Sequence, residues 1–145
     1  MEVAIRRVSV SDLETIADME REIFGESSYP INYLAELYLN ADYFMVATAG
    51  DWIVGYIIGR LERRVAHILS IAVREGYRRR GIGSMLLKSF IEYAIRRGAL
   101  RVYLEVSDRN EAAINFYLKH GFRVVDRIRR YYPDGSDALV MDMPL

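Results

Sequence analysis

Two hydrophobic periodicities alternate along the chain. Runs rich in β-branched and aromatic residues, several with apolar side chains at every second position, predict strands over residues 3–8, 43–49, 52–61, 67–73, 102–106, 122–132 and 138–143. Apolar residues at helical spacing predict a helix that begins at residue 13 and further helices over residues 31–39, 81–97 and 111–120. The order β-α-α-β-β-β-α-β-α-β-β predicts a single α/β domain over residues 1–145, with a mixed sheet and helices on both of its faces.

Local signals refine these expectations. Ser11 and Glu14 have the spacing of a capping box at the start of the first helix. Gly50-Asp51 predicts a hairpin, and the few polar residues over 67–73 indicate a central strand that is covered on both faces. In the third helix, the side chains expected to face the core are Ile82, Met85, Leu86, Phe90 and Ile91.

The composition excludes several functions. Twenty basic and twenty acidic side chains give a formal net charge of zero, whereas general nucleic-acid-binding proteins usually carry a basic excess. The chain has no cysteine, which excludes disulfides and thiolate nucleophiles, and its two histidines belong to no cluster with metal-ligand spacing. No stretch approaches the ~20 apolar residues of a membrane-spanning helix, and residues 1–7 do not resemble a signal peptide. We therefore expect a cytoplasmic protein that binds no nucleic acid, membrane or metal.

A glycine- and arginine-rich segment follows the fourth predicted strand and runs directly into a helix. Gly81 and Gly83 lack a Cβ atom, so an anion can approach the main-chain N–H groups closely, and the helix N-terminus adds partial positive charge. Arg78, Arg79 and Arg80 add charged hydrogen-bond donors. These features suit a diphosphate. The alternative is a solvated basic turn before a helix that starts with glycine.

Two common phosphate motifs fit this segment poorly. A Walker A loop begun at Gly76 would require Lys and Ser or Thr where Ile82 and Gly83 stand. A dinucleotide fingerprint begun at Gly81 fails at Leu86, which should be glycine or alanine.

A larger pattern includes the same segment. Arg78-x-x-Gly81-x-Gly83, after Ile71-Ala72-Val73, resembles the acetyl-CoA signature of the GNAT superfamily of N-acetyltransferases. Further positions match the pattern of that family: Leu104-Glu105-Val106, Asn110, Ala113, Tyr117 and Gly121-Phe122. The resemblance implies a GNAT fold, with a mostly antiparallel seven-stranded sheet and a splayed central pair of parallel strands. It also implies acetyl-CoA as the co-substrate.

The same resemblance implies which residues bind the coenzyme. The pantetheine arm would bind the backbone of the strand residues Ile71, Ala72 and Val73, with the N–H of Val73 as the oxyanion donor. Asn110 and Tyr117 would contact the coenzyme near the splayed strands. The diphosphate would bind the segment Arg78, Arg79, Arg80, Gly81, Ile82, Gly83 and Ser84.

Two side chains are candidates for the proton transfers that acetylation of an amine requires. Glu105 points away from the apolar face of its strand. It and Tyr117 match the general base and general acid of the ribosomal-protein alanine acetyltransferases (RimI), with the same twelve-residue separation. The alternatives are a Glu105 salt bridge to Arg101 or Arg127, and a core position for Tyr117.

The two histidines have other expected roles. The strand that contains His67 resembles that of N-terminal acetyltransferase catalytic subunits, in which the histidine lies away from the thioester, and we favour a structural role for it. His120 is expected at a helix end, where the helix dipole favours it.

Two segments indicate a peptide N-terminus as the acceptor. The hairpin that contains Tyr131 and Tyr132 resembles the substrate-closing hairpin of RimI and of the NatA catalytic subunit. The loop around Tyr29 is similar to the substrate loop of archaeal N-terminal acetyltransferases, although Ser27 stands where those relatives often have glutamate. An α-amine with a pKa of ~8 also loses its proton more easily than lysine at ~10.4, by roughly three kcal/mol.

The sequence thus favours an Nα-acetyltransferase. A lysine or small-amine acetyltransferase is the alternative within the same enzyme class, and a non-catalytic CoA-binding module is the alternative outside it. Ribosome association or an auxiliary subunit stays open, and we expect a monomer or weak dimer.

Overall fold

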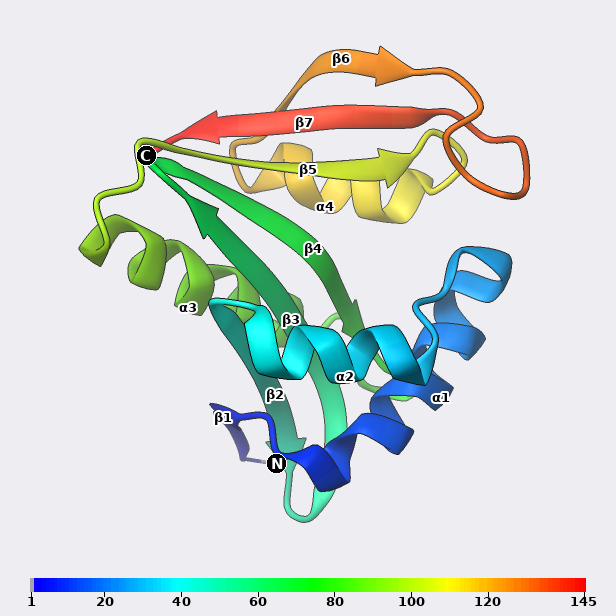
Figure 1. The fold of residues 1–145 in the computed structure, drawn as a ribbon, viewed down its shortest axis with the longest axis vertical. Helices are drawn as coiled ribbons and strands as arrows, with labels where there is room; N and C mark the ends of the chain where they lie inside the picture. The colour runs from blue at the N-terminus through cyan, green and yellow to red at the C-terminus, as the bar shows by residue number, and fades with distance from the viewer. Residues whose placement is uncertain (1) are drawn as a thin grey trace.

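The computed structural model describes residues 2–145, which form one seven-stranded sheet and four α-helices (Figure 1). The strands are β1 (Val3–Arg7), β2 (Tyr43–Ala49), β3 (Trp52–Glu62), β4 (Val65–Val73), β5 (Arg101–Ser107), β6 (Arg123–Ile128) and β7 (Ala138–Pro144). The helices are α1 (Leu13–Phe24), α2 (Ile31–Asn40), α3 (Ile82–Arg96) and α4 (Glu111–Lys119). Short 3-10 turns lie at Val10–Asp12, Gly25–Ser27 and Glu75–Tyr77.

The centre of the sheet is split. Strand order is β1-β2-β3-β4-β5-β7-β6, and every neighbouring pair is antiparallel except β4 and β5. These two parallel strands pair only from Val65–Arg101 to His67–Tyr103 and then separate, as Figure 1 shows. The predicted mixed sheet with a splayed central parallel pair is therefore confirmed.

Helices cover both faces of the sheet, as predicted. The helices α1 and α2 pack through Ile16, Met19 and Leu34 in one apolar cluster, and α3 and α4 contribute to a second. In the second cluster, a Cβ atom added to Gly59 would lie only 2.4 Å from ring atoms of Phe90. Glycine at position 59 therefore allows α3 to approach β3 closely.

The predicted cap of α1 is wrong in its residues. The carboxylate of Asp12 accepts a hydrogen bond from the backbone N–H of Ser9 at 2.7 Å and pairs with Arg6 at 2.8 Å. The bond from Arg6, followed by those from Ser9, lowers the pKa of Asp12 to about 2. The capping box therefore joins Ser9 and Asp12, not Ser11 and Glu14, and it caps the 3-10 turn Val10–Asp12 that leads into α1.

Two further predictions are corrected by packing. Met85 is 40% exposed, while Leu87 is buried, because the inner stripe of α3 runs through residues 82, 86, 90 and 94 and passes beside position 85. The strand predicted over residues 122–132 ends at Ile128. Its continuation is lost because Arg130 has a φ of 51° and its N–H donates to the Asp137 side chain instead of to a strand.

Candidate active site

The separation of β4 from β5 leaves one edge of β4 without a strand partner. Ile71, Ala72 and Val73 pair with β3 on one side only, and β5 has already diverged at this point. Backbone N–H and C=O groups on such an edge are available to an extended ligand. The strand segment predicted to bind the coenzyme arm therefore has the required free edge.

The predicted diphosphate segment joins this edge directly to α3. Gly81 is the N-cap of α3 with a φ of 81°, and Arg79 also has a positive φ of 62°. The first N–H groups of a helix have no partner within it, so those of Ile82, Gly83 and Ser84 are available at this end. The side chains of residues 78–80 are exposed, and within residues 2–145 they form no ion pair.

Two residues of this segment also have structural roles that the sequence did not show. A Cβ atom on Gly83 would lie 3.2 Å from the ring of Phe116, so this glycine lets α3 approach α4. The hydroxyl of Ser84 lies 2.8 Å from Nε2 of His120, whose Nδ1 donates to the carbonyl of Phe116 at 2.7 Å. Only the backbone of Ser84 is therefore free for an anion.

Asn110 lies at the start of α4, beside the splay. Its side-chain oxygen accepts a hydrogen bond from the N–H of Ala113 at 3.1 Å and caps the helix. The oxygen is thus used in the fold, and the amide NH₂ group is left for a ligand. His120 ends the same helix, as expected.

Tyr117 projects from α4 into the core cluster on the α3 side of the sheet. It is 6% exposed and packs edge-on against Phe116 and Phe122. Burial raises its pKa, with a smaller contribution from Tyr132. Its hydroxyl forms no hydrogen bond within the described residues, yet the oxygen is not sealed from solvent. A protonated phenol with a free hydrogen-bond donor suits a general acid.

Glu105 lies on the opposite face of β5 and pairs with His67. Its Oε1 atom lies 2.8 Å from Nε2 of His67, and the imidazole stacks on Tyr103 with ring centroids 4.1 Å apart. His67 and Tyr103 form the last pair before the strands separate.

The arginines offered as alternative partners of Glu105 are engaged elsewhere. Arg101 pairs with Asp142, and Arg127 pairs with Asp108 and Asp137. His67, for which the sequence favoured a structural role, contacts the candidate base instead. The parallel register of β4 and β5 creates this contact, and one sequence does not specify that register.

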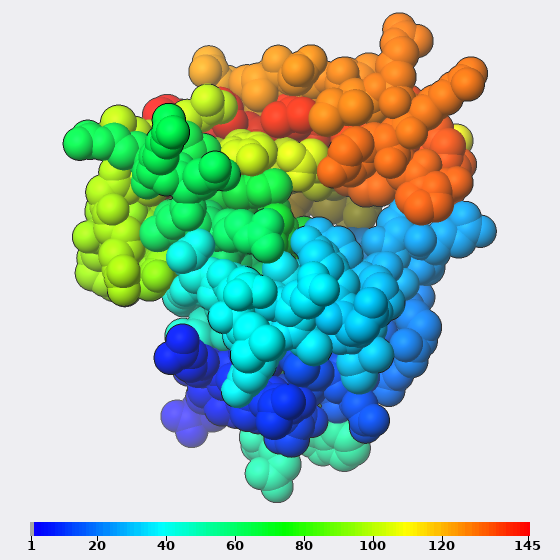
Figure 2. Space-filling model, viewed as in Figure 1, coloured from blue at the N-terminus to red at the C-terminus, as the bar shows by residue number. Residues whose placement is uncertain are grey.

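The three tyrosines predicted to bind the acceptor belong to two segments of the chain. We call residues 25–30 the acceptor loop and residues 129–137 the tyrosine hairpin. The phenol of Tyr29 donates to the carbonyl of Leu69 at 3.0 Å, and the rings of Tyr131 and Tyr132 meet edge-on. Burial raises the pKa of all three, and Glu105 contributes in each case. In Figure 2 the orange tyrosine hairpin lies next to the blue segment that contains the acceptor loop, and a recess opens beside them.

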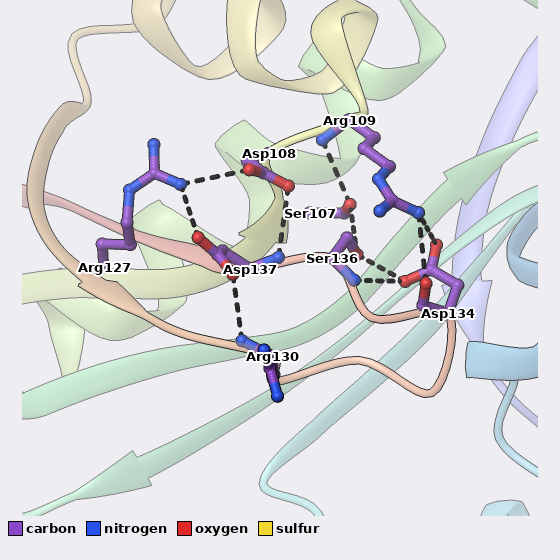
Figure 3. A network of polar contacts seen from close by, with 8 residues as sticks. All are labelled: Ser107, Asp108, Arg109, Arg127, Arg130, Asp134, Ser136 and Asp137. Atoms are coloured by element: carbon purple, nitrogen blue, oxygen red, sulfur yellow. Dashed lines mark hydrogen bonds and ion pairs between the residues drawn. The ribbon is translucent and has the colours of Figure 1, made fainter.

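A polar network fixes the tyrosine hairpin to the turn before α4 (Figure 3). Arg127 donates to Asp137 at 2.8 Å and to Asp108 at 3.1 Å, and the N–H of Asp137 donates to Asp108 at 3.2 Å. At the hairpin tip, Ser136 donates to Asp134 and accepts from Ser107 at 2.9 Å. The hairpin is thereby attached to the segment that leads to Asn110.

Glu20, a residue that the sequence analysis did not name, anchors the acceptor loop. Glu20 is 1% exposed and accepts a hydrogen bond from the N–H of Tyr29 at 2.8 Å. A signal was present, because Glu20 falls four residues after Ile16 and three after Ala17, on the apolar stripe of α1. A carboxylate on such a stripe indicates a buried polar contact.

Within residues 2–145, no group of three or more His, Cys, Asp or Glu side chains is placed to hold a metal ion. None of the helices in this part of the chain is long and apolar enough to cross a membrane.

Comparisons with known proteins show what the chain is similar to. The model of the "Acetyltransferase (GNAT) family" matches residues 11–122. An N-alpha-acetyltransferase of Sulfurisphaera tokodaii is 37% identical, covering 99% of this chain and 94% of its own length. A [ribosomal protein bS18]-alanine N-acetyltransferase of Salmonella typhimurium is 35% identical, with coverages of 87% and 80%.

Solved structures extend the similarity over the whole chain. Ard1 from Thermoplasma volcanium superposes with a TM-score of 0.94 at 33% identity, covering 100% of this chain and 99% of its own. Arabidopsis thaliana Naa50, in complex with the bisubstrate analogue CoA-Ac-MVNAL, superposes with a TM-score of 0.87 at 28% identity and covers 100% of both chains.

Proposed function

The chain belongs to the GNAT acetyltransferase family, whose co-substrate is acetyl-CoA, and we propose that it acetylates the N-terminal α-amine of a protein. One observation carries the proposal. The strands β4 and β5 separate after the His67–Tyr103 pair, and we call the opening between these two strands the notch. The Glu105–His67 contact lies on one face of the sheet beside it, and the buried Tyr117 lies on the other face. Such an arrangement suits an amine that approaches a thioester from the side opposite the general acid.

The coenzyme fits the free edge of β4 and the adjoining helix start. In the proposal, the pantetheine arm binds the backbone of Ile71–Val73, with the N–H of Val73 as the oxyanion donor. The diphosphate binds the N-terminus of α3 and the exposed arginines before it. The free NH₂ group of Asn110 contacts the coenzyme where the strands separate.

The proposed chemistry is direct transfer with two proton movements. The acceptor loses its ammonium proton to solvent before it reacts, and Glu105, oriented by His67, removes one further proton from the neutral amine as its nitrogen attacks. A bond forms between the amine nitrogen and the acetyl carbon, and the C–S bond breaks. Tyr117, which burial keeps protonated, donates its proton to the departing thiolate. The products are the N-acetylated acceptor and free CoA.

The acceptor is inferred from the relatives and from the mouth of the site. The Sulfurisphaera and Salmonella relatives are named for α-amine and alanine acetylation, and the Naa50 complex contains a peptide-based analogue. The tyrosine hairpin and the acceptor loop lie next to one another beside a recess (Figure 2), which suits a peptide terminus. We extend the proposal to a cytoplasmic monomer or weak dimer that associates with a ribosome or an auxiliary subunit.

A peptide panel tests the proposed acceptor. Peptides without lysine that begin with Ala, Ser or Met should be acetylated when their N-terminus is free, while N-terminally blocked peptides that contain lysine should not react. Mass spectrometry locates the acetyl group. Reaction only with the blocked, lysine-containing peptides would instead assign a lysine acetyltransferase.

A further inference from the structure

Glu20 is a carboxylate buried in an apolar region. It is 1% exposed and lies among the side chains of the cluster between α1, α2 and the sheet. Within residues 2–145 it forms no ion pair with an arginine or lysine. Burial of a carboxylate is costly unless hydrogen bonds replace its water. A specific set of donors must therefore stabilise it.

Those donors come from three separate segments. Oε1 of Glu20 accepts the N–H of Tyr29 in the acceptor loop at 2.8 Å. Oε2 accepts the hydroxyl of Ser70 on β4 at 2.8 Å and that of Tyr56 on β3. Both oxygens are thus occupied, so Glu20 joins the acceptor loop to the two central strands and has no free atom with which to act as a base.

Tyr29 is fixed at two points. Its N–H binds Glu20, and its phenol donates to the carbonyl of Leu69 on β4 at 3.0 Å. Leu69 and Ser70 immediately precede the β4 segment with the free edge. The structure of the loop itself is the short 3-10 turn Gly25–Ser27, whose backbone bond runs from the Ser28 N–H to the Gly25 carbonyl at 3.1 Å.

We infer that Glu20 is the positioning residue of the acceptor loop: it fixes Tyr29 against β4 and thereby sets the space for the first residue of the acceptor. The inference rests on the proposed peptide acceptor for its kinetic consequence, but the contact itself is independent of the substrate. Glu20 acts through Tyr29 and touches neither acceptor nor coenzyme.

Two substitutions distinguish the hydrogen bonds of the Glu20 side chain from its charge and its size as the cause of any effect. In Glu20→Gln, the amide oxygen can accept from Tyr29 while the NH₂ group donates to the hydroxyls of Tyr56 and Ser70, which can turn to accept. Glu20→Leu has no acceptor at all, although it suits the apolar surroundings and removes a buried charge, which need not lower stability. The glutamine variant should therefore rescue what the leucine variant loses.

The kinetic test compares the acceptor with the coenzyme. Glu20→Leu should raise the KM for an N-terminal peptide roughly tenfold, the effect of losing one hydrogen bond to a charged group, with kcat and the KM for acetyl-CoA within about twofold. Glu20→Gln should stay within about threefold of wild type in all three constants. The matched control is Asp12→Asn, which changes another buried carboxylate of the same region away from the notch and should lower thermal stability without raising the peptide KM.

Hydrogen exchange provides a readout that requires no substrate. The Tyr29 amide should be protected in the wild type and in Glu20→Gln, and should exchange at least tenfold faster in Glu20→Leu. Unchanged protection of Tyr29, or an unchanged peptide KM with faster exchange, would overturn the inference.

If Glu20→Leu does not fold, Ser70→Ala, which removes one donor, should still increase exchange at Tyr29, and failure to do so would equally overturn it. A wild type inactive on free N-termini would instead reject the proposed function and leave the exchange result to decide the role of Glu20.

Discussion

The acceptor loop and the tyrosine hairpin carry the three tyrosines proposed to bind the acceptor, but different interactions attach the two segments to the rest of the fold. A single buried carboxylate, Glu20, attaches the loop through neutral donors inside an apolar cluster. The hairpin is attached by an ion network around Arg127, whose side chain is 48% exposed, and by the hydroxyl bonds of Ser136. The loop packs against Tyr33 of α2 and the face of β4, whereas the hairpin is attached to the turn that begins α4.

This difference predicts how firmly each segment is fixed. A buried hydrogen bond in an apolar region is little affected by ions in solution, and its loss leaves an unsatisfied group. Exposed ion pairs contribute little individually and are screened by salt. We therefore expect the acceptor loop to be the rigid side of the notch and the tyrosine hairpin to be the adjustable side.

The largest effect should come from Tyr117, which belongs to neither segment. Tyr117→Phe should lower kcat by about a hundredfold, because the thiolate loses its proton donor, while acetyl-CoA affinity and peptide KM stay nearly unchanged. Thiol release measures kcat, and calorimetry measures coenzyme affinity. The melting temperature should not fall, because the hydroxyl has no partner within residues 2–145. Unaltered turnover would remove Tyr117 from the mechanism and leave the notch without its acid.

The residues proposed to bind the coenzyme were named from the sequence because their signals are local. Residues 78–84 are contiguous, and the glycine at position 81 is consistent with the positive φ and the helix start found there. Even there, the packing of Gly83 against Phe116 was not visible, because it depends on how α3 and α4 cross.

The acceptor side was less predictable because its contacts join distant segments. The Glu105–His67 contact spans 38 residues, and the contact of Glu20 with Ser70 spans 50. The hydrophobic pattern placed α1 and β4 correctly, but the pairing of their polar residues depends on strand register and helix rotation. The tyrosines were identified by resemblance, whereas the residues that fix them were not.

A smaller effect should follow from weakening the tyrosine hairpin. Asp137 accepts hydrogen bonds from the side chain of Arg127 and the N–H of Arg130. Asp137→Ala should raise the peptide KM roughly two- to fivefold, as expected for an exposed network, with kcat preserved. Asp126→Ala is the matched control, since Asp126 is an exposed carboxylate on β6 outside the network.

Ionic strength then distinguishes the two segments. Raising salt from about 0.05 to 1 M shortens the Debye length to about 3 Å, so the peptide KM of the wild type should rise while that of Asp137→Ala changes less. The exchange protection of the Tyr29 amide should not respond. A salt response equal in both proteins would show that the network does not control the hairpin.

The smallest effect should be a loosening of the hairpin at low pH. Hydrogen bonds from Ser136 lower the pKa of Asp134, and those from Arg130 and Arg127 lower the pKa of Asp137. A carboxyl group with a lowered pKa in the folded state stabilises that state above its ordinary pKa of ~3.9, and this contribution is lost as the pH falls through the lowered value. The amide of Tyr132, which donates to the Ser136 carbonyl at 3.2 Å, should therefore lose about two- to fivefold in protection between pH 6 and pH 3.

The amide of Ser28, bonded to a backbone carbonyl in the acceptor loop, is the internal reference, and Asp134→Asn with Asp137→Asn should abolish the difference between the two amides. If Tyr132 and Ser28 lose protection in parallel, the two segments open together, and the distinction between a rigid and an adjustable side is wrong.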